Sequence, residues 1–172
     1  MARKYEFELD FEVPEEASKD RFDLADAVYE AGFDDVAIGL GVPGLIAVPL
    51  EHEGVTARSA LLDAARRILK HLPKGSKLRS AGPDLVTLAD VADRLEVRRQ
   101  ALQKKRMPPP VTCGLFRASE IAQVLRAETR GKIALNMRLA TNWLDAAPAA
   151  QIINAELALG RDPLRANRRQ TA

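Results

Sequence analysis

Residues 85–106 constrain the fold more than any other stretch of the sequence. They predict a helix, a tight turn and a second helix, because Val91, Leu95, Val97 and Leu102 fall where two short helices share a small core. Ala92 stands fifth when the count starts at Leu88, at a place where a larger side chain would hold the two helices apart. The segment therefore predicts two helices in close contact.

The second helix of this pair carries a dense run of basic and amide side chains. They are Arg98, Arg99, Gln100, Gln103, Lys104, Lys105 and Arg106. A helix-turn-helix presents its second helix to the major groove of DNA in this way. Near the start of that helix, Arg99 can bond both acceptors of guanine and Gln100 can pair with the edge of adenine. We expect Lys104, Lys105 and Arg106 to hold phosphates instead, which gives affinity without sequence choice.

Two positions depart from the usual helix-turn-helix pattern. Glu96 occupies the turn position that glycine usually fills, where a Cβ atom is costly if φ is positive. Arg98 stands at the first position of the second helix, which is often serine. An ordinary helical hairpin with a solvated basic face shares the charge pattern and stays an alternative. The small Ala92, the apolar spacing and the basic second helix together favour DNA binding.

The residues around this pair extend the prediction. Thr87 is expected to cap the first helix, and the run 107–110, Met-Pro-Pro-Pro, to break the second. Residues 111–117 predict a short extended wing, and 119–125 predict a further helix. From the wing Arg117 would reach flanking DNA backbone or the minor groove, and a helix cap or an internal hydrogen bond is an equal alternative.

Residues 84–125 resemble bacterial helix-turn-helix proteins of the AlpA, excisionase and MerR-like winged kind. In those proteins the motif V-x-R-Q opens the recognition helix, and a wing that ends in x-x-R-x-S-E-I leads into a supporting helix. The matching residues are Val97, Arg99 and Gln100, then Arg117, Ser119, Glu120 and Ile121. The resemblance implies a DNA-binding regulator and supplies no ligand for it.

The first half of the chain predicts alternating strands and helices. The expected elements are a strand over 5–13, a helix over 19–31, strands over 36–42 and 45–51, a helix from the N-cap Thr56 to Leu72, and a short strand over 77–81. Pro43-Gly44 suits the centre of a type II turn, so the two middle strands are expected to form a hairpin. This is the βαββαβ order of a ferredoxin-like sandwich.

Charge divides the chain into an acidic and a basic half. Residues 1–83 hold 11 Lys and Arg against 15 Asp and Glu, and residues 84–172 hold 15 against 9. The predicted fold is α+β, with an acidic ferredoxin-like domain over 1–82 for ligand, partner or dimer contacts and a mostly helical winged helix-turn-helix domain over 83–127. Residues 128–172 are expected to form C-terminal helices, broken around Pro148, and a basic tail with Arg161, Arg165, Arg168 and Arg169.

These observations predict a sequence-specific double-stranded DNA-binding protein, a bacterial transcriptional regulator that acts as a homodimer. The C-terminal helices or the N-terminal sheet would make the dimer contact. The alternative is an antitoxin-like or phage-related interaction module that binds a protein through its acidic domain, with DNA binding secondary. No nucleophile–base pair, metal cluster or phosphate loop stands out, so we expect no enzyme, cofactor or metal.

The same sequence predicts a cytoplasmic protein without a membrane partner. The single cysteine, Cys113, excludes an internal disulfide, and the N-terminus leads into alternating charges without an apolar signal core. No apolar run approaches the roughly 18 residues that span a membrane.

Overall fold

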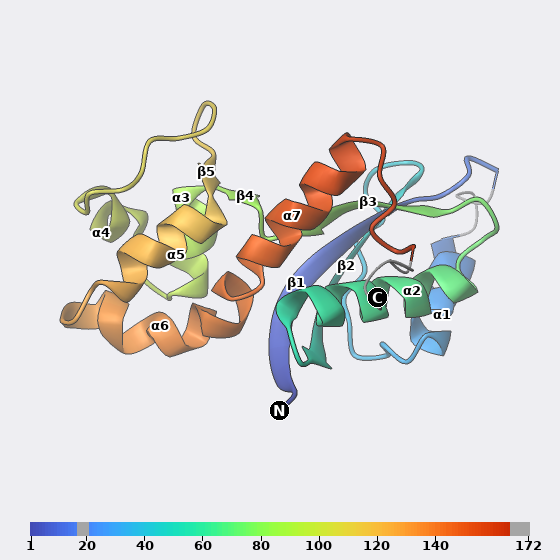
Figure 1. Cartoon of the computed structure of the whole chain (residues 1–172), viewed down its shortest axis with the longest axis horizontal. Coiled ribbons are helices and arrows are strands. Elements are labelled where there is room, and N and C mark those ends of the chain that lie inside the picture. The colour runs from blue at the N-terminus through green and yellow to red at the C-terminus, as the bar shows by residue number, and fades with distance from the viewer. Residues whose placement is uncertain (17–20, 166–172) are drawn as a thin grey trace, which may run out of the picture.

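The structure is a computed structural model that describes residues 1–16 and 21–165, and it is a mixed α+β protein, as predicted. Its elements form two lobes with α7 between them (Figure 1). The first lobe contains β1 (Arg3–Glu12), α1 (Arg21–Glu30), β2 (Leu45–Gly54), α2 (Ala57–His71) and β3 (Lys77–Gly82). The second lobe contains β4 (Leu85–Val86), α3 (Leu88–Arg94), α4 (Arg99–Gln103), β5 (Phe116–Arg117), α5 (Ala118–Arg126) and α6 (Gly131–Leu144). The last helix, α7 (Ala147–Ala158), runs from the second lobe back to the first.

The first lobe is built on a three-stranded antiparallel sheet in the order β2–β1–β3. The central strand β1 alternates, because Phe7, Leu9 and Phe11 are buried while Glu8 and Asp10 between them lie on the opposite face. Both α1 and α2 pack on the apolar face. The cap of α2 is as predicted: the Thr56 hydroxyl accepts a hydrogen bond from the Ser59 N–H at 3.1 Å.

The prediction of a strand over 36–42 is wrong. The sheet has three strands and lacks the fourth strand of a ferredoxin-like sandwich. Only Gly39 bridges to Ala47 of β2, through backbone hydrogen bonds of 2.8 and 2.9 Å. The Ala47 N–H points to this outer edge, and the next residue that points the same way is Pro49, which has no N–H to donate. In the other direction along β2, the turn at Pro43-Gly44 ends the pairing, and Gly44 has φ 77°, as a type II turn requires.

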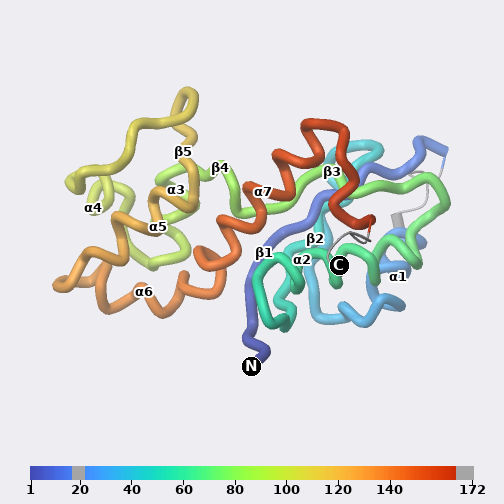
Figure 2. The backbone as a smooth tube through the Cα atoms, viewed as in Figure 1, coloured from blue at the N-terminus to red at the C-terminus, as the bar shows by residue number. Residues whose placement is uncertain are grey.

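The second lobe has its own core, formed by α3, α4, α5 and α6. Its fully buried large side chains are Leu95, Leu102, Ile121, Leu125 and Leu144. The predicted helix over 119–125 is present as α5, and the predicted wing contributes β5, which pairs with β4. The chain enters this lobe between β3 and β4 and leaves it between α6 and α7 (Figure 2).

The C-terminal segment predicted over 128–172 is divided between the two cores. Ile133 and Ala140 of α6 belong to the second core, whereas Ala150 and Ile153 of α7 belong to the first. The break falls just before Pro148, which sits in the first turn of α7, where a missing N–H costs little. The boundaries 1–82 and 83–127 stay predictions. Arg168 and Arg169 of the predicted tail lie outside the described residues.

Asn154 of α7 fastens the connection between the lobes. Its side-chain oxygen accepts from the Ala81 N–H at 2.8 Å, and its amide donates to the Ala81 carbonyl at 2.8 Å and to Asp84 at 2.9 Å. The following Gly82–Pro83 peptide bond is cis. The last residues of β3 and the start of β4 are therefore held by one side chain.

Candidate nucleic-acid interface

The turn between α3 and α4 is a Schellman motif closed by an unusual residue. The Val97 N–H donates to the Ala92 carbonyl at 3.0 Å, and the Glu96 N–H donates to the Asp93 carbonyl at 3.1 Å. Glu96 has φ 48° and is the one non-glycine residue with positive φ in the described part of the chain. The turn thus has the left-handed residue that glycine usually supplies, at the position where the sequence departs from the pattern.

Packing beneath the turn follows the sequence prediction. The space between the two helices is filled by Val91, Ala92, Leu95 and Leu102, and all four residues are buried. Val97 is half-buried at the edge of the same core. These contacts fix the angle between α3 and α4, because interior packing leaves no room for a larger residue at the position of Ala92.

A side chain of α6 anchors the turn from outside. The Asn136 amide donates to the Leu95 carbonyl at 2.8 Å, which satisfies a carbonyl at the C-terminal end of α3. The first helix is held at its other end by the predicted cap, because the Asp90 N–H donates to the Thr87 hydroxyl at 3.1 Å. The α3–turn–α4 unit is therefore fixed at both ends of α3.

The side chains predicted to contact bases lie exposed on one short helix. Arg99, Gln100 and Gln103 are exposed on α4, and Arg98 is its exposed N-cap residue without a side-chain capping bond. The helix is shorter than predicted: it ends at Gln103, so the basic residues 104–106 lie beyond it. The proline run that starts at residue 108 disfavours helical backbone at Met107, so the residues after Gln103 could not add a full further turn.

Two other predicted contact residues, Thr87 and Lys105, have partners within the protein, and a third, Arg117, is half-buried. The Thr87 hydroxyl donates to the Asp90 carboxylate at 2.7 Å as part of the α3 cap. The Lys105 ammonium donates to Glu128 at 2.7 Å and is half-buried, whereas Lys104 and Arg106 are exposed. Arg117 is half-buried at the N-cap position of α5 and makes no side-chain capping bond there.

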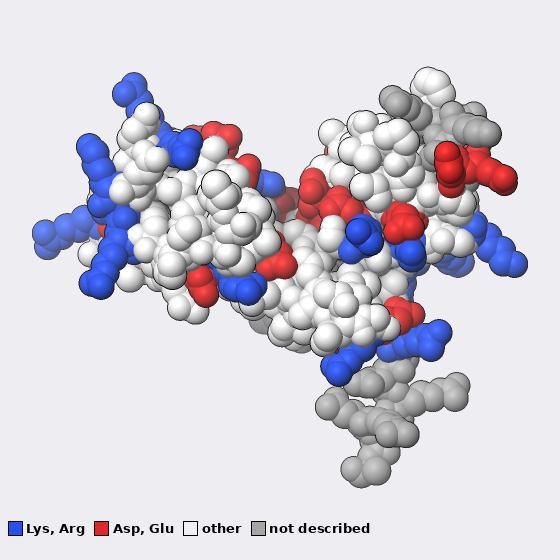
Figure 3. All heavy atoms as spheres, turned by 90° about the horizontal axis from the view of Figure 1, so that it is seen from above, with Lys and Arg blue, Asp and Glu red and all other residues white. Residues whose placement is uncertain are grey.

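The structure adds basic residues that the sequence prediction missed. The Lys105–Glu128 ion pair ties the end of α4 to the connection between α5 and α6. Exposed Arg130 and Lys132 stand in that connection and at the start of α6. Lys and Arg side chains accordingly gather at the end of the molecule that carries α4 and α6 (Figure 3). The signal in the sequence was the spacing of Arg126, Arg130 and Lys132 around one helix connection.

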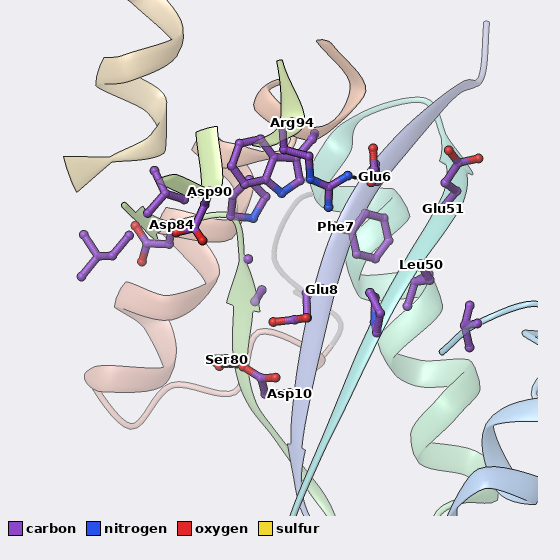
Figure 4. A pocket seen from close by; sticks show the side chains of 18 of the residues that line it. Glu6, Phe7, Glu8, Asp10, Leu50, Glu51, Ser80, Asp84, Asp90 and Arg94 are labelled. Atoms are coloured by element: carbon purple, nitrogen blue, oxygen red, sulfur yellow. Dashed lines mark hydrogen bonds and ion pairs between the residues drawn. The ribbon is translucent and has the colours of Figure 1, made fainter. Parts of the chain in front are cut away.

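An acidic cleft of about 920 Å³ separates the two lobes (Figure 4). Its carboxylates come from the open face of the sheet, from the loop at residue 35 and from the region of β4 and α3. They are Glu6, Glu8, Asp10, Asp35, Glu51, Asp84, Asp90 and Asp93. Arg94 is the basic residue of its described lining; it pairs with Glu6, and its guanidinium lies 5.2 Å from the centre of the Trp143 ring.

The electrostatics of this cleft disfavour nucleic acid. Burial, and then the neighbouring charge of Asp10, raise the pKa of the Glu8 carboxyl above its usual value. Burial contributes more to this rise than Asp10 does, so the cleft is a place where an added negative charge loses solvent and meets negative neighbours. A phosphate backbone would meet the same repulsion, so the exposed cations around α4 are the surface that suits a polyanion.

Comparisons of the chain with protein-family models, with curated proteins and with solved structures gave no match. Among the described residues, no group of three or more His, Cys, Asp or Glu side chains is arranged to hold a metal ion. None of the helices described combines the length and apolar character that a membrane span needs.

Proposed function

We propose that the protein binds double-stranded DNA through α4, as a sequence-specific regulator of the winged helix-turn-helix class. The observation that supports this most is the α3–turn–α4 unit. A Schellman turn and a buried Ala92 hold α4 against a rigid core, while its polar side chains face solvent at the basic end of the molecule. A reading helix needs both properties, because its side chains must reach base edges from a fixed frame.

The exposed residues divide into two expected roles. Arg99 and Gln100, in the first turn of α4, are proposed to contact base edges. Lys104 and Arg106, together with Arg130, are proposed to contact phosphates. The strands β4 and β5 with the loop before β5 would form the wing, with Arg117 near the flanking DNA. Lys105 contributes less in this proposal, because Glu128 already neutralises it.

The length of α4 limits how much sequence one copy can read. Five residues span about 7.5 Å of helix axis, which reaches only a few base pairs. Two copies related by a two-fold axis would read two half-sites and multiply the specificity. The proposed regulator is therefore a dimer on DNA.

The test begins with selection of bound sequences from random duplex DNA, followed by binding measurements over a range of salt concentrations. Arg99→Ala and Gln100→Ala should each lose about 1–3 kcal/mol of discrimination at one base position. Lys104→Ala should weaken binding to every sequence alike and lower the salt slope by about one. Lys70→Ala, an exposed lysine of α2, is the matched control and should change neither. Absence of salt-sensitive binding at low ionic strength would end the proposal.

A protein-interaction role is the second candidate, and the acidic cleft favours it. A cleft lined by carboxylates from both lobes suits a basic protein segment rather than DNA. Under this alternative a basic partner co-purifies with the full chain, and Glu8→Gln with Asp10→Asn releases it. DNA binding that survives these two substitutions, with no partner retained, favours the first candidate.

A further inference from the structure

We propose that the exposed face of α7 is the contact between two copies of this chain, which pair along α7 in antiparallel orientation. The residues that carry the inference are Pro148, Ile152, Ala155 and Leu159, all exposed. Ile152 and Leu159 are 53% and 68% exposed and lie on the same side of α7, so they form a shared apolar surface rather than isolated exposed residues. The need for a two-fold partner rests on the proposed function, whereas the location rests on these residues.

The spacing of these residues points to a helix as the partner. They follow one another at intervals of four, three and four positions, which places them on one narrow stripe of α7. This is the a/d spacing of helices that pack along each other. The opposite side of α7, with Ala150 and Ile153, already packs on the core of the first lobe. A helix with apolar stripes on two sides has room for a second neighbour.

The lack of positive charge on the exposed face of α7 disfavours a polyanion and favours a protein partner. α7 contains one charged residue, Glu156, and its carboxylate accepts from the Arg58 guanidinium at 2.8 and 3.1 Å. The stripe itself therefore offers no cation to a phosphate. Apolar surface that meets the same apolar surface leaves no charge unpaired, so the stripe is suited to a second copy of itself.

The order of side-chain sizes makes the stripe its own complement. Ala155 lies between two large residues, Ile152 three positions before it and Leu159 four positions after it. A two-fold axis at Ala155 brings Ile152 of one copy beside Leu159 of the other, and the two small Ala155 side chains let the helices approach closely. In Figure 1, α7 lies on the near side of the molecule with no other described element in front of it.

The charges at the two ends of α7 fit this antiparallel arrangement. Exposed Arg161 follows the C-terminal end of α7. At the other end, the Ser119 hydroxyl bonds the Gln151 side chain at 2.9 Å and brings the start of α5, with Glu120, beside α7. Antiparallel pairing places Arg161 of one copy toward the end of α7 beside which Glu120 of the other copy lies. One pair of short helices buries less than the roughly 800 Å² per partner of a standard interface, so we expect a dissociation constant in the micromolar range.

The test measures the mass of the full chain without DNA, by sedimentation velocity across the micromolar range. The wild-type chain should pass from monomer to dimer as concentration rises. The double variant Ile152→Glu with Leu159→Glu should stay monomeric, because each substitution weakens self-association by about tenfold or more. Leu135→Glu on α6, where the wild-type leucine is 73% exposed, is the matched control and should dimerise normally. Unchanged circular dichroism and thermal unfolding show that each variant is folded.

A cross-link tests the position of the two-fold axis. In a Cys113→Ser background, Ala155→Cys should form a disulfide-linked dimer under mild oxidation, and Ala158→Cys, exposed beside the stripe, should form much less. A chain that is monomeric at every concentration, or a dimer that survives the double glutamate variant, overturns this proposal. Neither result depends on DNA. Loss of salt-sensitive DNA binding in a chain that still dimerises instead overturns the proposed function alone.

Discussion

Replacing Glu96 by glycine tests the turn on which the position of α4 depends. Glu96 has φ 48°, in the left-handed region where a Cβ atom crowds the backbone. An L-residue pays about 1–2 kcal/mol for this conformation, which glycine avoids. Glycine also gives the unfolded chain more freedom, which returns about 0.4–1 kcal/mol. Glu96→Gly should therefore stabilise the protein by about 0.5–1 kcal/mol, a rise of roughly 1–4 °C in the unfolding temperature at this chain length.

Two companion variants separate backbone strain from charge. Glu96→Ala keeps the Cβ atom and should leave stability close to that of the wild type. Glu96→Gln keeps the side-chain size and removes the negative charge at the basic end of the molecule. If α4 binds DNA, Glu96→Gln and Glu96→Gly should both strengthen binding at low salt, while only Glu96→Gly should raise stability. Thermal and denaturant unfolding followed by circular dichroism measure the stability differences.

The result that refutes this reasoning is a specific order of the three variants. A Glu96→Gly chain that is less stable than the wild type, beside a Glu96→Ala chain that is more stable, means that residue 96 has helical rather than left-handed backbone. The Schellman hydrogen bonds of Glu96 and Val97 would then be absent, and α3 and α4 would no longer have the geometry proposed for binding DNA.

Three further predictions concern the packing and the cleft. Ala92→Leu should destabilise the protein by about 1–3 kcal/mol in denaturant unfolding, because the close approach of α3 and α4 leaves no space for the added carbons. Asn154→Ala should cost about 1–3 kcal/mol, because it removes the hydrogen bonds to the partly buried Ala81 peptide groups. The raised pKa of Glu8 means that its folded state is favoured when the carboxyl is protonated, and this contribution is lost as pH rises through the folded pKa. Glu8→Gln should therefore raise stability at neutral pH and give no difference below the usual range of glutamate, with Glu16→Gln as an exposed control.

Much of the first lobe follows from local sequence signals. The alternation in β1, the cap at Thr56 and the Pro43-Gly44 turn each depend on neighbouring residues alone, so the pattern identifies them. The prediction of an edge strand over 36–42 failed because the pairing of that strand depends on a different segment. Pro49 interrupts the hydrogen-bond ladder from the other side of the turn, and a reading of 36–42 by itself does not include that restriction.

The candidate interface shows the same distinction. The apolar spacing around Ala92 located the pair of helices, and Glu96 marked the strained turn. The ion pair between Lys105 and Glu128 depends on how α5 and α6 pack, so the sequence indicated a free cation where the structure has an internal partner. The destination of α7 was hidden for a similar reason: the sequence predicts C-terminal helices over 128–172 without indicating which core receives each of them.

The return of α7 to the first lobe has a consequence for how the protein is made. The core of the first lobe includes Ala150 and Ile153, and these residues follow the whole of the second lobe in the chain. As a ribosome extends the chain from the N-terminus, the sheet and its two helices emerge early but lack one of their packing partners. The strands and helices of the second lobe have all emerged before α7 does. The protein therefore completes its N-terminal lobe last, and a stalled or shortened chain would carry an intact second lobe beside a first lobe with exposed apolar surface.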